Sequence, residues 1–264
     1  MATTEIDLDD GARTILEVWG EGGPIVLCVH GMTSSRKAWV RLGQRLDGRC
    51  RIAAYDQRGH GDASGTRGPM TLETHVADID AVARSLGSDL FALVGHSWGG
   101  AVVILAGKRD DAQRVVAIDP VLRVLPGTWN ADYLDDAQAL FALPKPAREL
   151  SIRSALAAWH PTDVEGKLHA VEHMAAEPIA RLGSENRVDE GGWNLLEAVV
   201  DYPKPLLVFA AGPDDSVMST NDVAHLKARG GANVRIAAFP DEGHNLHRTA
   251  FDAFATEVAA FLGV

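Results

Sequence analysis

Residues 95–100 read Gly-His-Ser-Trp-Gly-Gly, and this stretch decides the expected fold. An apolar run that predicts a buried strand precedes it (Phe91–Val94), and a predicted helix follows it (Ala101–Gly107). A serine at the centre of Gly-x-Ser-x-Gly between a strand and a helix is typical of a nucleophile elbow, a turn in which only glycine fits on either side. Such a turn exposes the serine in strained backbone. The pattern predicts that Ser97 is a nucleophile; the alternative is a glycine-rich turn with an incidental serine.

The rest of the chain alternates predicted strands with predicted helices. Most of the strands are continuous apolar runs, as expected of strands buried on both faces of a parallel sheet. Helical patterns with one apolar face fall between them. We expect an α/β fold with a mostly parallel, eight-stranded sheet and helices on both faces. The predicted strands are Glu5–Leu8, Thr14–Trp19, Ile25–Val29, Arg51–Tyr55, Phe91–Val94, Val115–Ile118, Leu206–Ala210 and Val234–Phe239.

Residues 121–200 interrupt this alternation, because they carry helical patterns and several prolines but no convincing strand. We expect them to form a helical cap that is inserted after the sixth strand. The sequence thus predicts a core domain of residues 1–120 and 201–264 and a cap of residues 121–200. Trp129 and Trp159 of the predicted cap are expected to contact substrate, with packing inside the cap as the alternative.

Five motifs follow predicted strands, and their order carries a family resemblance. They are His30-Gly31, Asp56-Gln57-Arg58-Gly59-His60-Gly61, the stretch around Ser97, Gly212-Pro213-Asp214-Asp215 and Gly243-His244. With these motifs the chain resembles the α/β-hydrolase family, in its serine-hydrolase, carboxylesterase-like branch. The resemblance covers about the whole chain and implies an enzyme that works without a cofactor.

A serine hydroxyl becomes a good nucleophile when a histidine takes its proton and a carboxylate holds that histidine in the right tautomer. The resemblance implies the chain order serine, acid, histidine. Ser97, Asp215 and His244 satisfy this order. Asp119, at the end of the sixth predicted strand, and Asp214 remain alternatives to Asp215.

The chain has ten histidines, and several could compete for the role of base. His247 is the nearest rival of His244, but we expect it to be a solvated residue at a helix start. His96 lies in the elbow and is expected to point away from the serine and to pack or hydrogen-bond. His60 belongs to a loop motif that the resemblance implies is structural.

The resemblance also implies an oxyanion hole, formed by the backbone N–H groups of Met32 and Trp98. The side chains of both residues are expected to line the substrate pocket. Core packing of these side chains is the alternative, and it leaves the role of the two N–H groups unchanged.

Charge and composition exclude several other classes of function. The 25 Lys and Arg against 36 Asp and Glu give a net charge of −11, which disfavours binding to nucleic acid or to an anionic membrane. The acidic N-terminus carries no signal-peptide pattern, so a cytoplasmic protein is expected, either a monomer or a homodimer. His169 and His173 have the spacing of a helical metal-binding pair but lack a third ligand, so we expect no metal site and no cofactor.

The sequence therefore predicts a serine hydrolase that cleaves a small to medium carboxylic ester through an acyl-enzyme intermediate. Hydrolysis of a lactone, an amide or a carbon–carbon bond, and perhydrolysis, use the same residues and remain alternatives. A non-catalytic ligand receptor on the same fold is the alternative from another class. Fold does not fix the substrate, which is expected to be a small molecule.

Overall fold

The computed structural model describes residues 2–65, 67–87, 90–109, 112–126, 131–174 and 176–264. One eight-stranded sheet runs through it, with the strand order β1-β2-β4-β3-β5-β6-β7-β8. Pairing is antiparallel between β1 and β2 and between β2 and β4, and parallel between all other neighbours. The strands are β1 (Ala2–Asp7), β2 (Arg13–Trp19), β3 (Ile25–Val29), β4 (Arg51–Tyr55), β5 (Leu90–His96), β6 (Arg114–Ile118), β7 (Leu206–Ala211) and β8 (Val234–Phe239). The predicted fold class is confirmed.

Helices cover both faces of this sheet. Successive side chains of a strand point to opposite faces, so an apolar strand needs an apolar cover on each side. Leu27 and Val29 of β3 belong to the apolar cluster under α2 (Leu72–Leu86) and α3 (Trp98–Ala106). Val26 and Cys28 belong to the cluster under α1 (Val40–Arg45) and α11 (Phe251–Leu262). Two further helices are α9 (Thr220–Arg229) and α10 (Leu246–Thr249), and the short 3-10 helices η1 (Arg36–Trp39) and η2 (Gly61–Ala63) follow β3 and β4.

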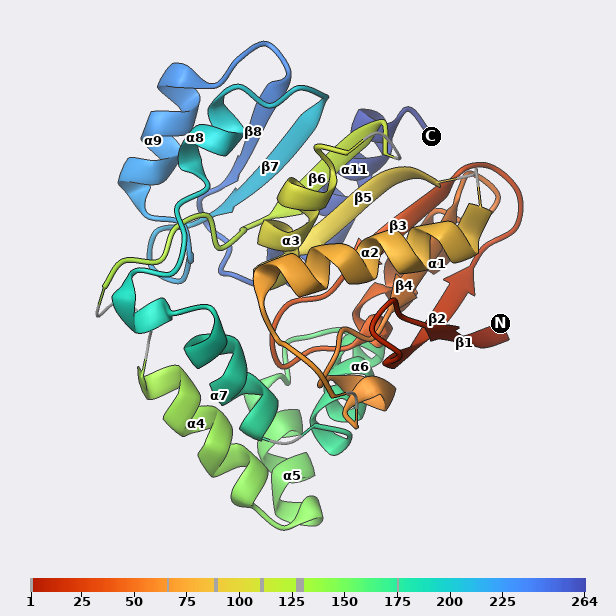
Figure 1. Ribbon diagram of the computed structural model, residues 1–264, viewed down its shortest axis with the longest axis vertical. Coiled ribbons are helices and arrows are strands. Elements are labelled where there is room, and N and C mark those ends of the chain that lie inside the picture. The colour runs from red at the N-terminus through yellow and green to blue at the C-terminus, as the bar shows by residue number, and fades with distance from the viewer. Residues whose placement is uncertain (1, 66, 88–89, 110–111, 127–130, 175) are drawn as a thin grey trace.

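In the segment between β6 and β7, residues 121–200, most of the described residues are helical. It contains α4 (Ala131–Ala142), α5 (Lys145–Ala155), α6 (Pro161–Glu172), α7 (Ala176–Glu185), η4 (Val188–Glu190) and α8 (Leu196–Val200). Its described residues form no strand and only one isolated antiparallel bridge, between Arg123 and Asn194. Figure 1 shows α4, α5, α6 and α7 gathered to one side of the sheet, with α8 back beside α9.

Two ends of this segment meet at a narrow neck next to the sheet. The N–H group of Val124 donates to the carbonyl oxygen of Trp193 (3.0 Å), and that of Leu195 donates to the carbonyl of Leu122 (2.7 Å). The segment also touches the core through α6, which packs against η1, α1 and η2. These contacts fix where the helical segment leaves and rejoins the sheet.

Candidate active site

Ser97 occupies a strained turn between β5 and α3. Its backbone has φ 57° and ψ −118°, a region that residues other than glycine rarely adopt. Its N–H group donates to the carbonyl oxygen of Ile118 at the end of β6 (2.9 Å). The turn is therefore tied to the neighbouring strand, and Ser97 stands at the N-terminus of α3 as predicted.

The glycines on either side of Ser97 are needed for steric reasons. A Cβ atom on Gly95 would lie closer than 3.0 Å to the carbonyl oxygen of Gly99. A Cβ atom on Gly99 would lie equally close to the carbonyl oxygens of Val29 and His30. Gly31 brings the loop after β3 against the serine, because its own Cβ would lie 3.0 Å from the Cβ of Ser97. The loop expected to supply an oxyanion donor thus lies beside Ser97.

Asp119 holds the imidazole ring of His244. The Nδ1 atom of His244, in the loop after β8, lies 2.6 Å from Oδ2 of Asp119. Asp119 follows the end of β6 directly, its carboxylate is fully buried, and its backbone has a positive φ of 38°. Since β6 pairs with β5, Asp119 and Ser97 both start from the carboxyl ends of adjacent strands.

Three further donors fix the carboxylate of Asp119. Ser216 donates its hydroxyl to Oδ1 (2.6 Å), and the N–H of Val217 donates to Oδ2 (3.0 Å). The N–H of Ala211, the last residue of β7, approaches Oδ1 at 3.5 Å. A buried carboxylate that accepts this many hydrogen bonds is held in one orientation, which fixes the ring of His244 in turn.

The prediction that Asp215 contacts the His244 ring is wrong. Asp215 accepts a hydrogen bond from the backbone N–H of His244 (3.1 Å), and its side chain lies where a Cβ on Gly243 would be. Both Asp215 and Asp214 are exposed, whereas Asp119 is buried. The physical reason is the strand order, in which the end of β6 lies directly between those of β5 and β7. The carboxylate of Asp119, at the end of β6, therefore reaches the ring of His244. Asp215, in the loop after β7, binds the backbone of His244 instead.

Two more histidines surround His244. His96 donates from Nε2 to the carbonyl oxygen of His244 (2.9 Å), which agrees with its expected hydrogen-bonding role. The ring of His247 lies 4.2 Å from that of His96, between ring centroids, and is buried rather than solvated as expected. Burial holds the pKa of both rings well below the ordinary value, so both are neutral near pH 7.

The residues expected to contact substrate lie in different environments. Trp98 is fully buried, with its ring 5.2 Å from that of His75 and 5.4 Å from that of Trp193, so its side chain packs in the core. Met32 is partly buried against the same apolar cluster. Trp159 is partly exposed under the guanidinium of Arg248, and Trp129 lies outside the described residues.

Sequence reasoning missed two cationic side chains near this site, Lys167 and Arg248, which we call the cation pair. Lys167 of α6 donates from Nζ to the carbonyl oxygen of Thr33 (2.8 Å) and to its hydroxyl (2.9 Å). Arg248 is buried and donates to the hydroxyl of Ser34 (3.1 Å). Within the described residues, neither has a carboxylate within ion-pair distance. No sequence pattern marks either residue, since each becomes informative only when the fold brings it to the loop after β3.

Desolvation decides the charge state of the cation pair. Burial and the nearby charge of Arg248 lower the pKa of Lys167 to about 7. Burial lowers the pKa of Arg248 to about 10. Both cations lie beside the loop after β3. An anion near them is favoured, because its negative charge offsets the free-energy cost of removing the two cations from water.

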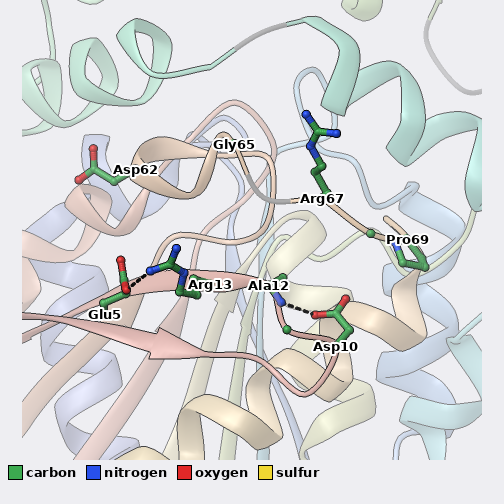
Figure 2. Close-up of a pocket in the computed structure, with 10 residues that line it drawn as sticks. Glu5, Asp10, Ala12, Arg13, Asp62, Gly65, Arg67 and Pro69 are labelled. Atoms are coloured by element: carbon green, nitrogen blue, oxygen red, sulfur yellow. Dashed lines mark hydrogen bonds and ion pairs between the residues drawn. The ribbon is translucent and has the colours of Figure 1, made fainter.

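A separate hollow of about 690 Å³ opens beside the β1–β2 hairpin. Figure 2 shows Glu5 and Arg13 paired on its wall, with Asp62 and Pro69 at opposite ends. Its volume is that of many small-molecule sites, but neither Ser97 nor His244 lines it. The catalytic candidates therefore lie outside this hollow.

In the described part of the chain, no helix is both long and apolar enough to cross a membrane.

Comparisons with known proteins agree with this fold. A model of the alpha/beta hydrolase family matches residues 26–257. The chain is 31% identical over 268 residues to lipase LipV of Mycobacterium tuberculosis, covering 92% of this chain and 94% of that protein. It is 35% identical over 217 residues to a 2-(acetamidomethylene)succinate hydrolase of Mesorhizobium japonicum, covering 75% of this chain and 74% of that protein.

The fold also matches solved structures over its full extent. N-formylmaleamic acid deformylase from Pseudomonas putida S16 has a TM-score of 0.78 to this chain at 17% sequence identity. The match covers 97% of this chain and 100% of the deformylase. At this identity the likeness concerns the fold alone.

Proposed function

Since the chain belongs to the alpha/beta hydrolase family, we propose that it is a serine hydrolase that cleaves a small to medium carboxylic ester. Ser97 is the nucleophile, His244 the base and Asp119 the carboxylate that orients His244. The observation that carries this proposal is the 2.6 Å contact between Asp119 and Nδ1 of His244, on the strand next to the elbow that bears Ser97.

In the proposed mechanism, the hydroxyl oxygen of Ser97 attacks the ester carbonyl while Nε2 of His244 takes its proton. The tetrahedral intermediate collapses, and the alcohol leaves with that proton, which gives an acyl-serine. Water then attacks the acyl-serine, His244 again takes a proton, and the acid is released with Ser97 restored. The negative charge of Asp119 stabilises the imidazolium that forms at each step.

The developing oxyanion needs two preorganised donors. Trp98 is the first residue of α3, where backbone N–H groups have no acceptor within the helix. Met32 follows Gly31, which packs against Ser97. We therefore keep the N–H groups of Trp98 and Met32 as the proposed oxyanion donors, and residues 121–200 as the proposed cap over the site.

A fluorophosphonate tests the proposal directly. We expect it to add once, at Ser97, and His244→Ala to prevent the addition, because an unactivated serine reacts poorly. Hydrolysis of p-nitrophenyl acetate by the same protein separates an enzyme from a ligand receptor, which should show almost no turnover. Labelling that maps to another serine, or no labelling with no turnover, would contradict the proposal.

The cation pair favours a second candidate, hydrolysis of an ester or amide whose substrate carries a carboxylate. One relative fits this chemistry by name, since it is a hydrolase of a succinate derivative. Lys167 contacts the loop that lies beside Ser97, so a substrate carboxylate near it would be within a short distance of the elbow.

Two p-nitrophenyl esters separate the candidates, a neutral acetate and a half-ester of succinic acid. If the cation pair binds a substrate carboxylate, Lys167→Met should raise KM for the succinate half-ester about tenfold or more and leave that for the acetate nearly unchanged. The matched control is Lys227→Met, on the exposed side of α9. Equal effects on both esters would exclude the second candidate and leave the first intact.

A further inference from the structure

Three side chains from distant parts of the chain meet at one face of α6. Asp62 lies in η2, in the loop after β4, and His169 and His173 lie at the end of α6. Each offers a ligand atom, and these atoms all lie within 4.8 Å of one another. The spacing of the two histidines places them on the same face of the helix. The structure thus supplies the third ligand that the sequence did not show.

The two oxygens of the Asp62 carboxylate lie near different rings. Nδ1 of His173 lies 2.7 Å from Oδ1 of Asp62, and Nε2 of His169 lies 3.6 Å from Oδ2. The two imidazole rings stack, with centroids 4.7 Å apart and planes 27° apart. The 2.7 Å contact is a hydrogen bond, and an ion that displaces its proton would reach all three residues, whose ligand atoms lie within 4.8 Å of one another.

Ser35 fixes which nitrogen of His169 faces Asp62 as an acceptor. Its hydroxyl donates towards the carbonyl oxygen of Gly166 (3.5 Å), so it accepts from Nδ1–H of His169 (3.2 Å). In a neutral ring this leaves the lone pair of Nε2 facing a carboxylate oxygen. Two facing acceptors repel each other, and either a proton on Nε2 or a cation between the two atoms removes this repulsion. A hydrogen bond on the far nitrogen is also the usual way in which a protein orients a metal-binding histidine.

The surrounding charges leave room for a cation. Arg36 pairs with Asp62 through Oδ2 (2.8 Å), and it also pairs with Asp56 and Glu17. Lys37 pairs with Glu17 as well (2.5 Å). These ion pairs therefore join two positive side chains to three carboxylates. Oδ1 of Asp62 can bind an ion while Oδ2 keeps its contact with Arg36.

We propose that Asp62, His169 and His173 bind a divalent transition-metal ion, with Zn²⁺ the best match to two imidazoles and one carboxylate. Zn²⁺ takes four ligands from nitrogen and oxygen donors, and water would fill the fourth position. Asp62 also lines the hollow in Figure 2, which gives the ion a path from solvent.

The site would act as a clamp between the helical segment and the core. Asp62 belongs to the core loop after β4, whereas His169 belongs to α6 and His173 caps the C-terminus of that helix. The same helix carries Lys167, which contacts the loop beside Ser97. A bound ion would hold α6 against that loop, so it would stabilise the folded state by binding it and not the unfolded chain. This proposal does not depend on the reaction that the protein catalyses.

Zn²⁺ binding to the full chain tests the site. The protein is treated with a chelator, freed of it, and titrated with ZnSO₄ at pH 7, where Zn²⁺ stays dissolved. We expect one equivalent to bind with micromolar or lower Kd and to raise the melting temperature. His173→Gln and Asp62→Asn should each weaken binding about tenfold or more and remove the increase in melting temperature.

The matched control is His225→Gln, because His225 pairs with Glu197 on the surface (2.9 Å) without a second histidine. It should leave Zn²⁺ binding unchanged. Circular dichroism confirms that each variant is folded, and the exposure of His173 makes its replacement mild for folding. Absence of binding up to 1 mM Zn²⁺, or binding that both site variants leave intact, would overturn the proposal.

Discussion

Replacing Asp119 by Asn should nearly abolish hydrolysis, whereas the same change at Asp215 should matter little. Every contact of the Asp119 carboxylate comes from a donor: Ser216 and Ala211 on one oxygen, Val217 and His244 on the other. An amide brings a donor of its own, so it must break the contacts on one side or turn the imidazole to the wrong tautomer. It also removes the negative charge that stabilises the imidazolium.

The magnitude follows from the loss of both effects. In the serine-protease triad, the corresponding change lowers kcat about 10⁴-fold, and at about 1.36 kcal/mol for each factor of ten this is ~5.5 kcal/mol of transition-state stabilisation. Asp215→Asn keeps an acceptor oxygen for the N–H of His244, and its side chain is exposed. We expect it to cost about 1 kcal/mol or less, which is under tenfold in rate.

The assay is the initial rate of p-nitrophenol release from p-nitrophenyl acetate, with folding of each variant checked by circular dichroism. Ser97→Ala gives the baseline, and adding Asp119→Asn to it should cost nothing further, because residues that act as a unit are not additive. Equal losses for the two variants, or a larger loss for Asp215→Asn, would refute the assignment of Asp119.

Three further outcomes are expected. Ser97→Ala should lower hydrolysis on the order of a million-fold while the protein stays folded; near-normal activity, after contamination is excluded, would end the serine-hydrolase proposal. Gly99→Ala should destabilise the fold by about 1–3 kcal/mol in urea unfolding, since its Cβ would meet the backbone of β3, whereas Gly65→Ala, with open space around it, should change little. Acid should destabilise the protein through three histidines whose pKa burial lowers to about 3, His30, His60 and His75. Because the unfolded chain binds these protons below about pH 6.5, stability should fall as pH drops from 6.5 towards 3, by ~1.4 kcal/mol per pH unit for each ring. Urea unfolding at pH 7, 6 and 5 measures this, His75→Gln should flatten the slope, and a free energy that is constant from pH 7 to 5 would contradict it.

The sequence predicts the sheet and the elbow well because both depend on local patterns. A continuous apolar run such as Ile25–Val29 can be buried on both faces only in a covered parallel sheet. The glycines around Ser97 act within one turn, so their spacing alone indicates the geometry. The structure agrees with the predicted bounds of most strands to within a few residues.

The contacts of Asp119 and His247 could not be predicted in the same way. Which carboxylate reaches His244 depends on Ser216 and Val217, which are 97 and 98 positions from Asp119 in sequence. His247, in α10, is buried because the ring of Trp39 and that of Phe254 in α11 pack against it, and no local pattern encodes that packing. The third side chain of the metal-binding cluster, Asp62, lies 111 positions from His173.

The neck brings the two ends of the helical segment close together. Across an antiparallel bridge such as that of Arg123 with Asn194, the Cα atoms lie about 4.5–5.5 Å apart. This is a span that a two-residue hairpin turn can close. Ser97 and Asp119 precede the neck and His244 follows it, so a change in the length of the helical segment leaves the strand ends that carry these three residues in place. The length of the helical segment is therefore independent of the spacing among Ser97, Asp119 and His244.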